Sequence, residues 1–184
     1  MGKVSDALMA VTAHISRANL NHVLSALTYE NQLVIRVAMA TGLRVGDVLS
    51  LKTSQLAPRF TVQEQKTGKN RRCFIGKGLY EELLKQAGKV WVFPHRTDGK
   101  KHRTRQAVYK DIKRAAKLFR IDGNIGTHSI RKMYAVEQFH KTGDLNAVQK
   151  KMNHASPTVT MIYAMADQLT NRGKRGKLKR GELK

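Results

Sequence analysis

The apolar residues of this chain recur at helical spacing almost throughout, and the exception is one pair of short runs with strand-like alternation. These runs, 60–63 and 72–75, flank a polar turn with the sequence Lys66-Thr67-Gly68-Lys69-Asn70, which is typical of a β-hairpin. The other segments predict helices over 5–27, 79–87, 108–119, 127–140 and 144–153. The helix over 108–119 is expected to carry an apolar stripe of Val108, Ile112, Ala115 and Phe119. The pattern therefore favours an α+β fold, mainly α-helical and compact, with one small antiparallel β-sheet.

Several of the remaining segments have recognisable ends. Thr28 is a candidate N-cap for a helix that Gly42 interrupts, and Pro58 is expected to stop its short continuation. The stretch 90–93 is expected to be a short buried strand or an extended segment. Ser156-Pro157 has the N-cap and first-turn proline that begin a last helix.

The apolar pattern disappears after Leu169. The following residues are mostly Lys, Arg and Gly, a composition typical of a solvated, flexible segment. A chain of 184 residues has the size of one ordinary domain. We therefore expect a single domain over 1–169 and a flexible basic tail over 170–184.

Basic residues greatly outnumber acidic ones. The chain has 35 Lys and Arg against 13 Asp and Glu, a formal charge of +22, yet 41% of its residues are hydrophobic. Such a charge on a folded body favours a nucleic-acid partner over a merely basic protein. The residues expected to contact phosphates, unless they only form a solvated basic face, are Lys69, Arg71, Arg72, Lys100, Lys101, Arg103 and Arg105.

Other features exclude some classes of protein. A single cysteine, Cys73, excludes an intramolecular disulfide framework and a multi-cysteine zinc site. No apolar run approaches the roughly 20 residues of a membrane span, and the N-terminus lacks the regions of a signal peptide. We expect a soluble cytoplasmic protein with no membrane partner.

Four local clusters carry residues suited to phosphate chemistry, although each has an ordinary structural explanation by itself. Arg44 interrupts an apolar segment, and Asp47, three residues later along a helix, is placed to pair with it. Lys66 lies at the expected hairpin tip. His128 and Arg131 share one helical face near a helix start, where anions bind well. The fourth cluster is Asn153-His154-Ala155-Ser156-Pro157, followed by Tyr163.

In this order and spacing, the clusters resemble the catalytic domain of the tyrosine recombinases, the phage integrases and their relatives. The motif of that family is an Arg, a hairpin Lys, His-x-x-Arg, a His or Trp, and a Tyr nine positions later. The resemblance covers about residues 20–167 and assigns these catalytic places to Arg44, Lys66, His128, Arg131, His154 and Tyr163, with Asp47 in support. For the lysine, Lys66 before Thr-Gly fits better than Lys69 or Lys77.

The chain departs from the family pattern in a few places. Asn153 replaces the glycine that usually precedes the second histidine, and Lys132 replaces a frequent histidine. About 20–40 residues precede the first cluster, too few for the N-terminal helical domain of most members. The chain is expected to be an isolated catalytic domain, a fragment of a longer integrase, or a short relative like the fimbrial DNA invertases.

The residue types suit DNA cleavage without ATP, cofactor or metal. Two guanidinium groups can neutralise the charge that builds on a pentacoordinate phosphorus, so no divalent ion is required. Tyr163 is the expected nucleophile and His128 its proton acceptor. By family analogy, Lys66 protonates the departing 5′-oxygen. The expected products are a 3′-phosphotyrosine on Tyr163 and a free 5′-hydroxyl. The 5′-hydroxyl of a second strand can then attack the phosphotyrosine ester and rejoin the DNA.

The resemblance implies a site-specific recombinase or integrase that acts on double-stranded DNA, with four protomers at a synapse. Its setting is the nucleoid of a bacterial cell or a phage-infected host. Two alternatives are a DNA-binding accessory protein with a non-catalytic site and a type IB topoisomerase-like enzyme. The basic tail is expected to track DNA, dock on a neighbouring protomer, or remain disordered.

Overall fold

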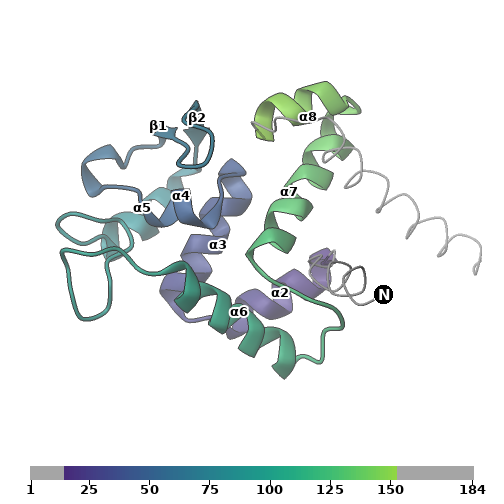
Figure 1. Cartoon of the computed structure of the whole chain (residues 1–184), viewed down its shortest axis with the longest axis horizontal. Coiled ribbons are helices and arrows are strands. Elements are labelled where there is room, and N and C mark those ends of the chain that lie inside the picture. Colours follow the sequence, from purple (N-terminus) through teal and green to yellow (C-terminus); the bar gives the residue numbers. More distant parts are fainter. Residues whose placement is uncertain (1–14, 153–184) are drawn as a thin grey trace, which may run out of the picture. The chain divides into compact units, whose positions relative to one another are not determined.

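The computed structural model describes residues 15–152, which fall into two compact units. The first unit ends at Met133 and the second begins at Tyr134. Figure 1 shows the elements of both units along the chain. His154, Tyr163, the helix expected after Pro157 and the expected boundary at residue 169 lie outside the described residues.

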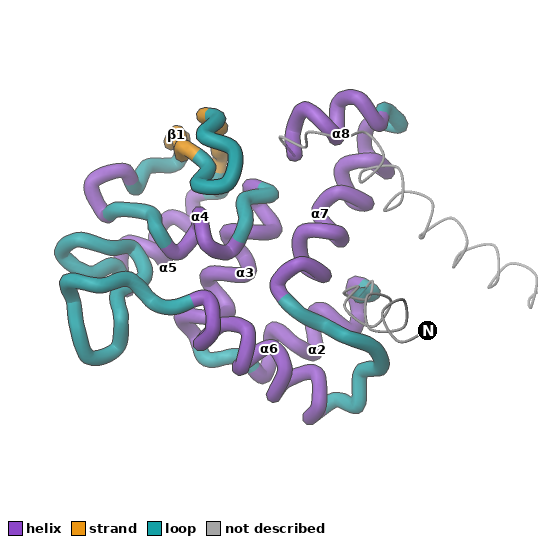
Figure 2. Tube along the Cα trace, in the orientation of Figure 1, coloured by secondary structure: helices purple, strands orange, loops and turns teal. Residues whose placement is uncertain are grey.

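The regular structure of the first unit is mainly helical, as the apolar spacing predicts (Figure 2). The α-helices are α2 (Arg17–Ala26), α3 (Tyr29–Thr41), α4 (Val45–Leu49), α5 (Lys77–Gln86), α6 (Arg105–Leu118) and the start of α7 (Thr127–Thr142). A short 3₁₀ turn, Thr53–Gln55, follows α4. The prediction of a mainly helical protein is confirmed.

The predicted hairpin forms from β1 (Arg59–Gln63) and β2 (Asn70–Phe74), and the two strands pair in antiparallel register. Phe60 lies opposite Cys73, and Val62 lies opposite Arg71. These four residues point to the buried face, while their neighbours along each strand are exposed. The stretch 90–93 is not a strand of the sheet: its backbone bends at Val90, Val92 and Phe93, and Trp91 forms an isolated bridge with Lys52.

The core of this unit surrounds α3, whose residues Leu33, Val34, Ile35 and Val37 are all fully buried. The helix α6 packs against α2 (Figure 1). Its predicted apolar stripe of Val108, Ile112 and Ala115 is fully buried.

The prediction that Phe119 belongs to this buried stripe is wrong. Phe119 follows the last residue of α6 and is 38% exposed. Because the chain leaves the helix at this point, the ring turns outward and stacks on the imidazole of His22, with ring centroids 5.1 Å apart.

The ends of α3 and α4 lie on either side of Arg44 in the sequence. Gly42 ends α3 in a left-handed conformation (φ 70°), which a glycine adopts without steric cost, and its N–H donates to the Ala38 carbonyl. The following helix, α4, ends at Leu49 rather than continuing to Pro58. It stops early because the Leu51 carbonyl accepts a hydrogen bond from the Val92 N–H, which draws this backbone into extended pairing.

The second unit contains the C-terminal part of α7 and the helix α8 (Leu145–Met152). The carboxylate of Asp144 accepts a hydrogen bond of 2.7 Å from the Asn146 N–H, as expected of an N-cap. A small apolar cluster joins the two helices through Tyr134, Ala135, Val148 and Met152. Within residues 15–152, no helix combines the length and apolar character needed to cross a membrane.

Candidate active site

A pocket of about 400 Å³ lies in the first unit, where the start of α4, the hairpin turn, and the first turns of α6 and α7 meet. The four predicted catalytic residues that lie within 15–152 all line it, although they come from three separate parts of the sequence. The lining residues are Arg44, Val45, Gly46, Asp47, Gln65, Lys66, Arg105, Thr127, His128 and Arg131.

Arg44 is held by an acidic residue that the sequence motifs do not indicate. Its Nη1 atom lies 2.5 Å from Oε2 of Glu64, a carboxylate with no solvent exposure, while 21% of the Arg44 side chain is exposed. The predicted pairing of Arg44 with Asp47 is therefore wrong. The three-residue helical spacing does not apply, because Arg44 precedes α4 as its N-cap and has an extended backbone.

Asp47 instead supports the hairpin turn. Its Oδ1 atom accepts a hydrogen bond of 2.9 Å from the backbone N–H of Gln65. The Asp47 side chain is buried at 2% exposure and lines the pocket. Its contact therefore reaches the residue next to Lys66, so Asp47 supports the turn that carries the predicted catalytic lysine and not Arg44.

Lys66 projects from a tight turn between the strands. The carbonyl of Glu64 accepts hydrogen bonds from the N–H groups of Thr67 and Gly68, at 3.3 and 2.8 Å. Gly68 has φ 65°, a conformation in which other residues are strained. Lys66 and Lys69 are both exposed, but of the two only Lys66 lines the pocket.

Arg131 lies almost entirely inside the unit, with 7% exposure, and its Nη1 donates a hydrogen bond to the carbonyl of Gly42. Burial, followed by repulsion from Arg44 and Arg71, lowers the pKa of Arg131 to about 10. The guanidinium is therefore still charged at neutral pH, and an arriving anion would relieve its repulsion from the neighbouring cations.

His128 faces the same group of cations from one turn earlier in α7. Desolvation, and then the charges of Arg105, Arg131, Arg44 and Lys66, lower the pKa of the imidazole below its ordinary 6.5. The ring is therefore neutral at pH 7 and able to accept a proton.

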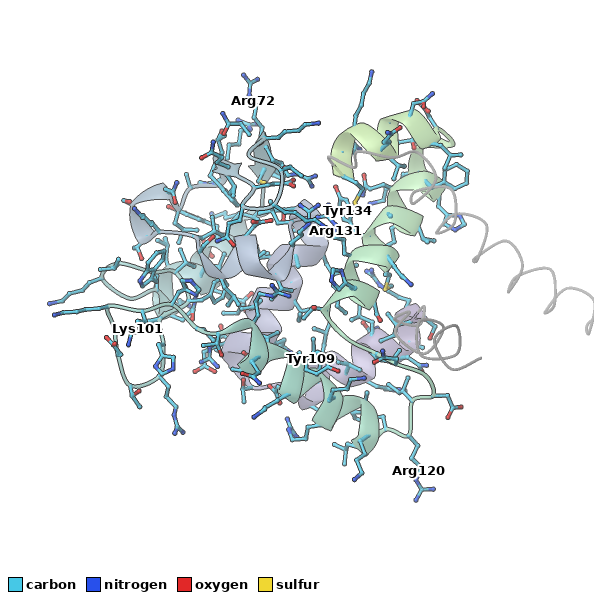
Figure 3. The ribbon with its side chains drawn as sticks, viewed as in Figure 1. Arg72, Lys101, Tyr109, Arg120, Arg131 and Tyr134 are labelled. Atoms are coloured by element: carbon cyan, nitrogen blue, oxygen red, sulfur yellow. The ribbon has the colours of Figure 1, made fainter. Side chains whose placement is uncertain are left out.

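The predicted phosphate-contact residues divide into two groups. Most are exposed, and Figure 3 shows Arg72 and Lys101 extending outward, in contrast to Arg131. Arg103 is only partly exposed; its Nη2 lies 3.7 Å from Oε2 of Glu30. Arg105 is exposed but also lines the pocket, so this residue belongs to the site as well as to the basic surface.

Arg71 departs from the expectation for this set. It is 7% exposed; its Nε atom lies 2.7 Å from Oε1 of Glu64, and its Nη1 donates to the Thr41 carbonyl at 3.2 Å. The side chain is turned inward because strand alternation places residue 71 on the same face as Cys73. The prediction of a surface phosphate contact is therefore wrong for Arg71, which supports the site from within.

Sequence reasoning misses two features of the site, namely Glu64 and the inward role of Arg71. A usable signal exists, because Phe60, Val62 and Glu64 alternate on the side of the hairpin that is buried. Within residues 15–152, no group of three or more His, Cys, Asp or Glu side chains is arranged to hold a metal ion.

Known proteins resemble this chain in sequence. A model of the "Phage integrase family" matches residues 10–169. The probable integrase/recombinase YoeC of Bacillus subtilis (strain 168) is 29% identical over 143 residues, covering 72% of this chain and 75% of the relative. The tyrosine recombinase XerD of Rhizobium meliloti (strain 1021) is 32% identical over 142 residues, 71% of this chain and 45% of the relative. This chain spans about half the length of several curated relatives that it matches.

Solved structures share the fold. A XerH site-specific recombinase in a post-cleavage complex with palindromic difH matches with a TM-score of 0.72 and 19% identity, over 97% of this chain and 56% of that chain. The catalytic domain of bacteriophage HP1 integrase matches with a TM-score of 0.62 and 20% identity, over 84% of this chain and 88% of that chain. Together with the matched family model, these findings confirm the resemblance drawn from the motifs: the chain belongs to the phage integrase family, the tyrosine recombinases.

Proposed function

We propose that this chain cuts and rejoins DNA strands at a specific site through a 3′-phosphotyrosyl intermediate on Tyr163. The observation that carries the proposal is the pocket in which Arg44, Lys66, His128 and Arg131 meet. Four groups of this chemistry, drawn from separate segments into about 400 Å³, suit one phosphodiester with its developing charge.

In the proposed reaction, the phenol oxygen of Tyr163 attacks the phosphorus and transfers its proton to neutral His128. The bond from phosphorus to the 5′-oxygen breaks, and Lys66 supplies the proton that makes this oxygen a hydroxyl. Arg44 and Arg131 neutralise the nonbridging oxygens, and His154 donates one further hydrogen bond. The phosphotyrosyl ester retains the energy of the cleaved bond, so the 5′-hydroxyl of another strand can reverse the steps.

Double-stranded DNA is the proposed partner, and its backbone would meet the exposed basic residues beside the pocket. We assign the activity to residues 1–169 as one catalytic domain and treat 170–184 as a basic tail. Assembly of four protomers at a synapse is also proposed, since one structural neighbour is a lambda integrase tetramer bound to a Holliday junction. We place the protein on the nucleoid of a bacterial cell or phage-infected host.

The proposal is tested by trapping the protein on DNA from the flanks of its own gene, in chelator and without ATP. The reaction is stopped with SDS, so only a covalent complex survives. We expect an adduct with the wild-type chain and none with Tyr163→Phe, which lacks only the nucleophilic oxygen and should bind DNA as before. An adduct of equal yield from Tyr163→Phe would refute the proposed nucleophile.

A further inference from the structure

Glu64 is a buried carboxylate between two arginines, and the proposed reaction does not use it. Its two oxygens face different partners: Oε2 lies 2.5 Å from Nη1 of Arg44, and Oε1 lies 2.7 Å from Nε of Arg71. The Glu64 side chain has no exposure, and that of Arg71 has only 7%. Since an isolated buried charge is strongly unfavourable, this grouping is stable only with its ionic partners in place.

The two arginines differ in what else they can reach. Arg71 also donates to the Thr41 carbonyl and does not line the pocket, so its charge is directed into the fold. Arg44 lines the pocket and retains 21% side-chain exposure. Glu64 therefore holds one edge of the Arg44 guanidinium from inside the protein. A guanidinium has five N–H donors in a fixed plane, so fixing one of them restricts where the others point.

The same residue also begins the turn that carries Lys66. The backbone N–H of Glu64 donates to the Lys69 carbonyl at 3.0 Å, and its own carbonyl accepts from Thr67 and Gly68. The Thr67 hydroxyl donates to Glu64 Oε2 at 3.3 Å, the oxygen that pairs with Arg44. The orientation of Arg44 is thereby tied to the turn on which the general acid lies.

From these contacts we propose that Glu64 is a positioning residue, which orients the Arg44 guanidinium toward the phosphate, while Arg71 balances the remaining negative charge. This inference rests on the proposed function, because it concerns the same reaction. It accounts for a buried acidic group beside a pocket that is proposed to bind an anion: Glu64 does not line the pocket itself but holds one N–H of Arg44, and the other N–H groups are left for the substrate.

The test compares Glu64→Gln with Glu82→Gln, in the wild-type and Arg44→Ala backgrounds. Glu82 is a matched control, since it pairs with Arg36 at 2.6 Å and does not line the pocket. With Arg44 present, we expect Glu64→Gln to slow adduct formation about 10²-fold, the size of loss that misplacing a reacting group by about 1 Å causes. Without Arg44, the same change should have less than about a threefold effect on the remaining rate, because the two residues act as one unit. Glu82→Gln should leave the rate unchanged.

An equal slowing by Glu64→Gln in both backgrounds would overturn the proposal, because the residue would then act on stability or on another group. A wild-type rate in Glu64→Gln would overturn it as well. If Glu64→Gln does not fold, Glu64→Asp serves instead, because it keeps the charge but withdraws it by one methylene. The same dependence on Arg44 is expected of Glu64→Asp, with a smaller loss.

A second measurement separates this inference from the proposed function, since it needs no DNA cleavage. Phenylglyoxal, which modifies accessible arginines, is applied to each variant, and the modified residues are located by mass spectrometry. We expect Glu64→Gln to speed modification of Arg44 but not of Arg36, and Glu82→Gln to have the opposite selectivity. Unchanged Arg44 reactivity in Glu64→Gln would refute the positioning role, whereas absence of a wild-type DNA adduct would count against the proposed function alone.

Discussion

The carboxylate of Asp47 accepts a hydrogen bond of 2.9 Å from the backbone N–H of Gln65, the residue immediately before Lys66. This contact joins α4, which directly follows Arg44, to the hairpin turn. Asp47, which helical spacing would pair with Arg44, therefore supports the turn that carries Lys66. With Glu64 behind Arg44, two buried carboxylates connect the hairpin to the start of α4.

Replacing Asp47 with Ala should loosen the turn that carries Lys66. The Gln65 N–H would lose its acceptor, so we expect the free energy of unfolding to fall by about 1 kcal/mol, the net contribution of a hydrogen bond whose donor water can reach. Hydrogen exchange at the Gln65 amide should also become faster. A matched control is Asp98→Ala, which removes a carboxylate that accepts from the Lys100 N–H at 3.0 Å in a loop outside the pocket. Unchanged exchange at Gln65 in Asp47→Ala would show that the contact does not hold the turn.

Removing Arg105 should raise the pKa of His128. Among the charges that lower this pKa, Arg105 is the largest cause after desolvation. NMR titration of the histidine rings should give His128 a pKa below 6.5 in the wild type and a higher one in Arg105→Ala. The signal is assigned by its absence from His128→Gln. Arg96→Ala removes an exposed charge that does not line the pocket and should not move the titration. An identical titration in Arg105→Ala would contradict the electrostatic account of this site.

Asp111 should be important for stability, because it caps a helix to which it does not belong. From α6, its Oδ2 atom accepts hydrogen bonds from the Thr28 N–H at 2.9 Å, the Thr28 hydroxyl at 3.2 Å and the Asn31 amide at 2.8 Å. We expect Asp111→Ala to lower the free energy of unfolding by about 2 kcal/mol, as for loss of a strong N-cap. Urea titration at neutral pH measures this, with the exposed residue Asp122 changed to Ala as control; an effect no larger than that of the control would refute the cap.

We also expect the contribution of Asp111 to the stability of the fold to depend on pH. Burial raises the pKa of Asp111, but the hydrogen bonds from Asn31 and Thr28 and the contact with Arg114 outweigh it, so the pKa is below the ordinary 3.8. A lowered carboxyl pKa stabilises the fold above pH 3.8 and ceases to do so as pH falls through the folded-state value. The stability difference between wild type and Asp111→Asn should therefore shrink below pH 3.8. A difference that stays constant from neutral pH down through this range would contradict the expectation.

Arg131→Ala should reduce both the affinity for DNA and the rate of adduct formation, because the buried guanidinium is proposed to contact the phosphate. Loss of one such preorganised donor costs about 10²–10³-fold in rate. Single-turnover kinetics on trapped DNA measure the rate, and fluorescence anisotropy measures the affinity. Arg96→Ala serves as the control for loss of one positive charge. Unchanged cleavage by Arg131→Ala would reject the role of this residue as an anion clamp.

Local sequence patterns predict the order of elements in the described part of the chain well. The hairpin follows from alternation around Thr67-Gly68, and the end of α3 follows from Gly42, because both depend on backbone preferences of neighbouring residues. The end of α4 does not lie at Pro58, as the local pattern predicts, because its true cause is pairing with a segment about 40 residues later, around Val92. A purely local pattern contains no information on that contact.

The partners of the site residues are harder to predict than the residues themselves. Helical spacing would pair Arg44 with Asp47, but the backbone at Arg44 is extended and leads to Glu64 instead. By its charge, Arg71 would be grouped with the surface cations. Strand alternation instead places it on the same face as Cys73, which is the buried side. Charge alone does not distinguish a solvated arginine from one that balances a buried carboxylate; the strand register does.

The most direct test of the central claim is to locate the nucleotide on the protein after trapping. The adduct is trimmed with nuclease and digested with trypsin, and the peptides are sequenced by mass spectrometry. Cleavage after Lys151 and Arg172 releases a peptide with one tyrosine, Tyr163, of the five in the chain. We predict that the nucleotide mass lies on Tyr163 of this peptide. A nucleotide on any other residue would contradict the account.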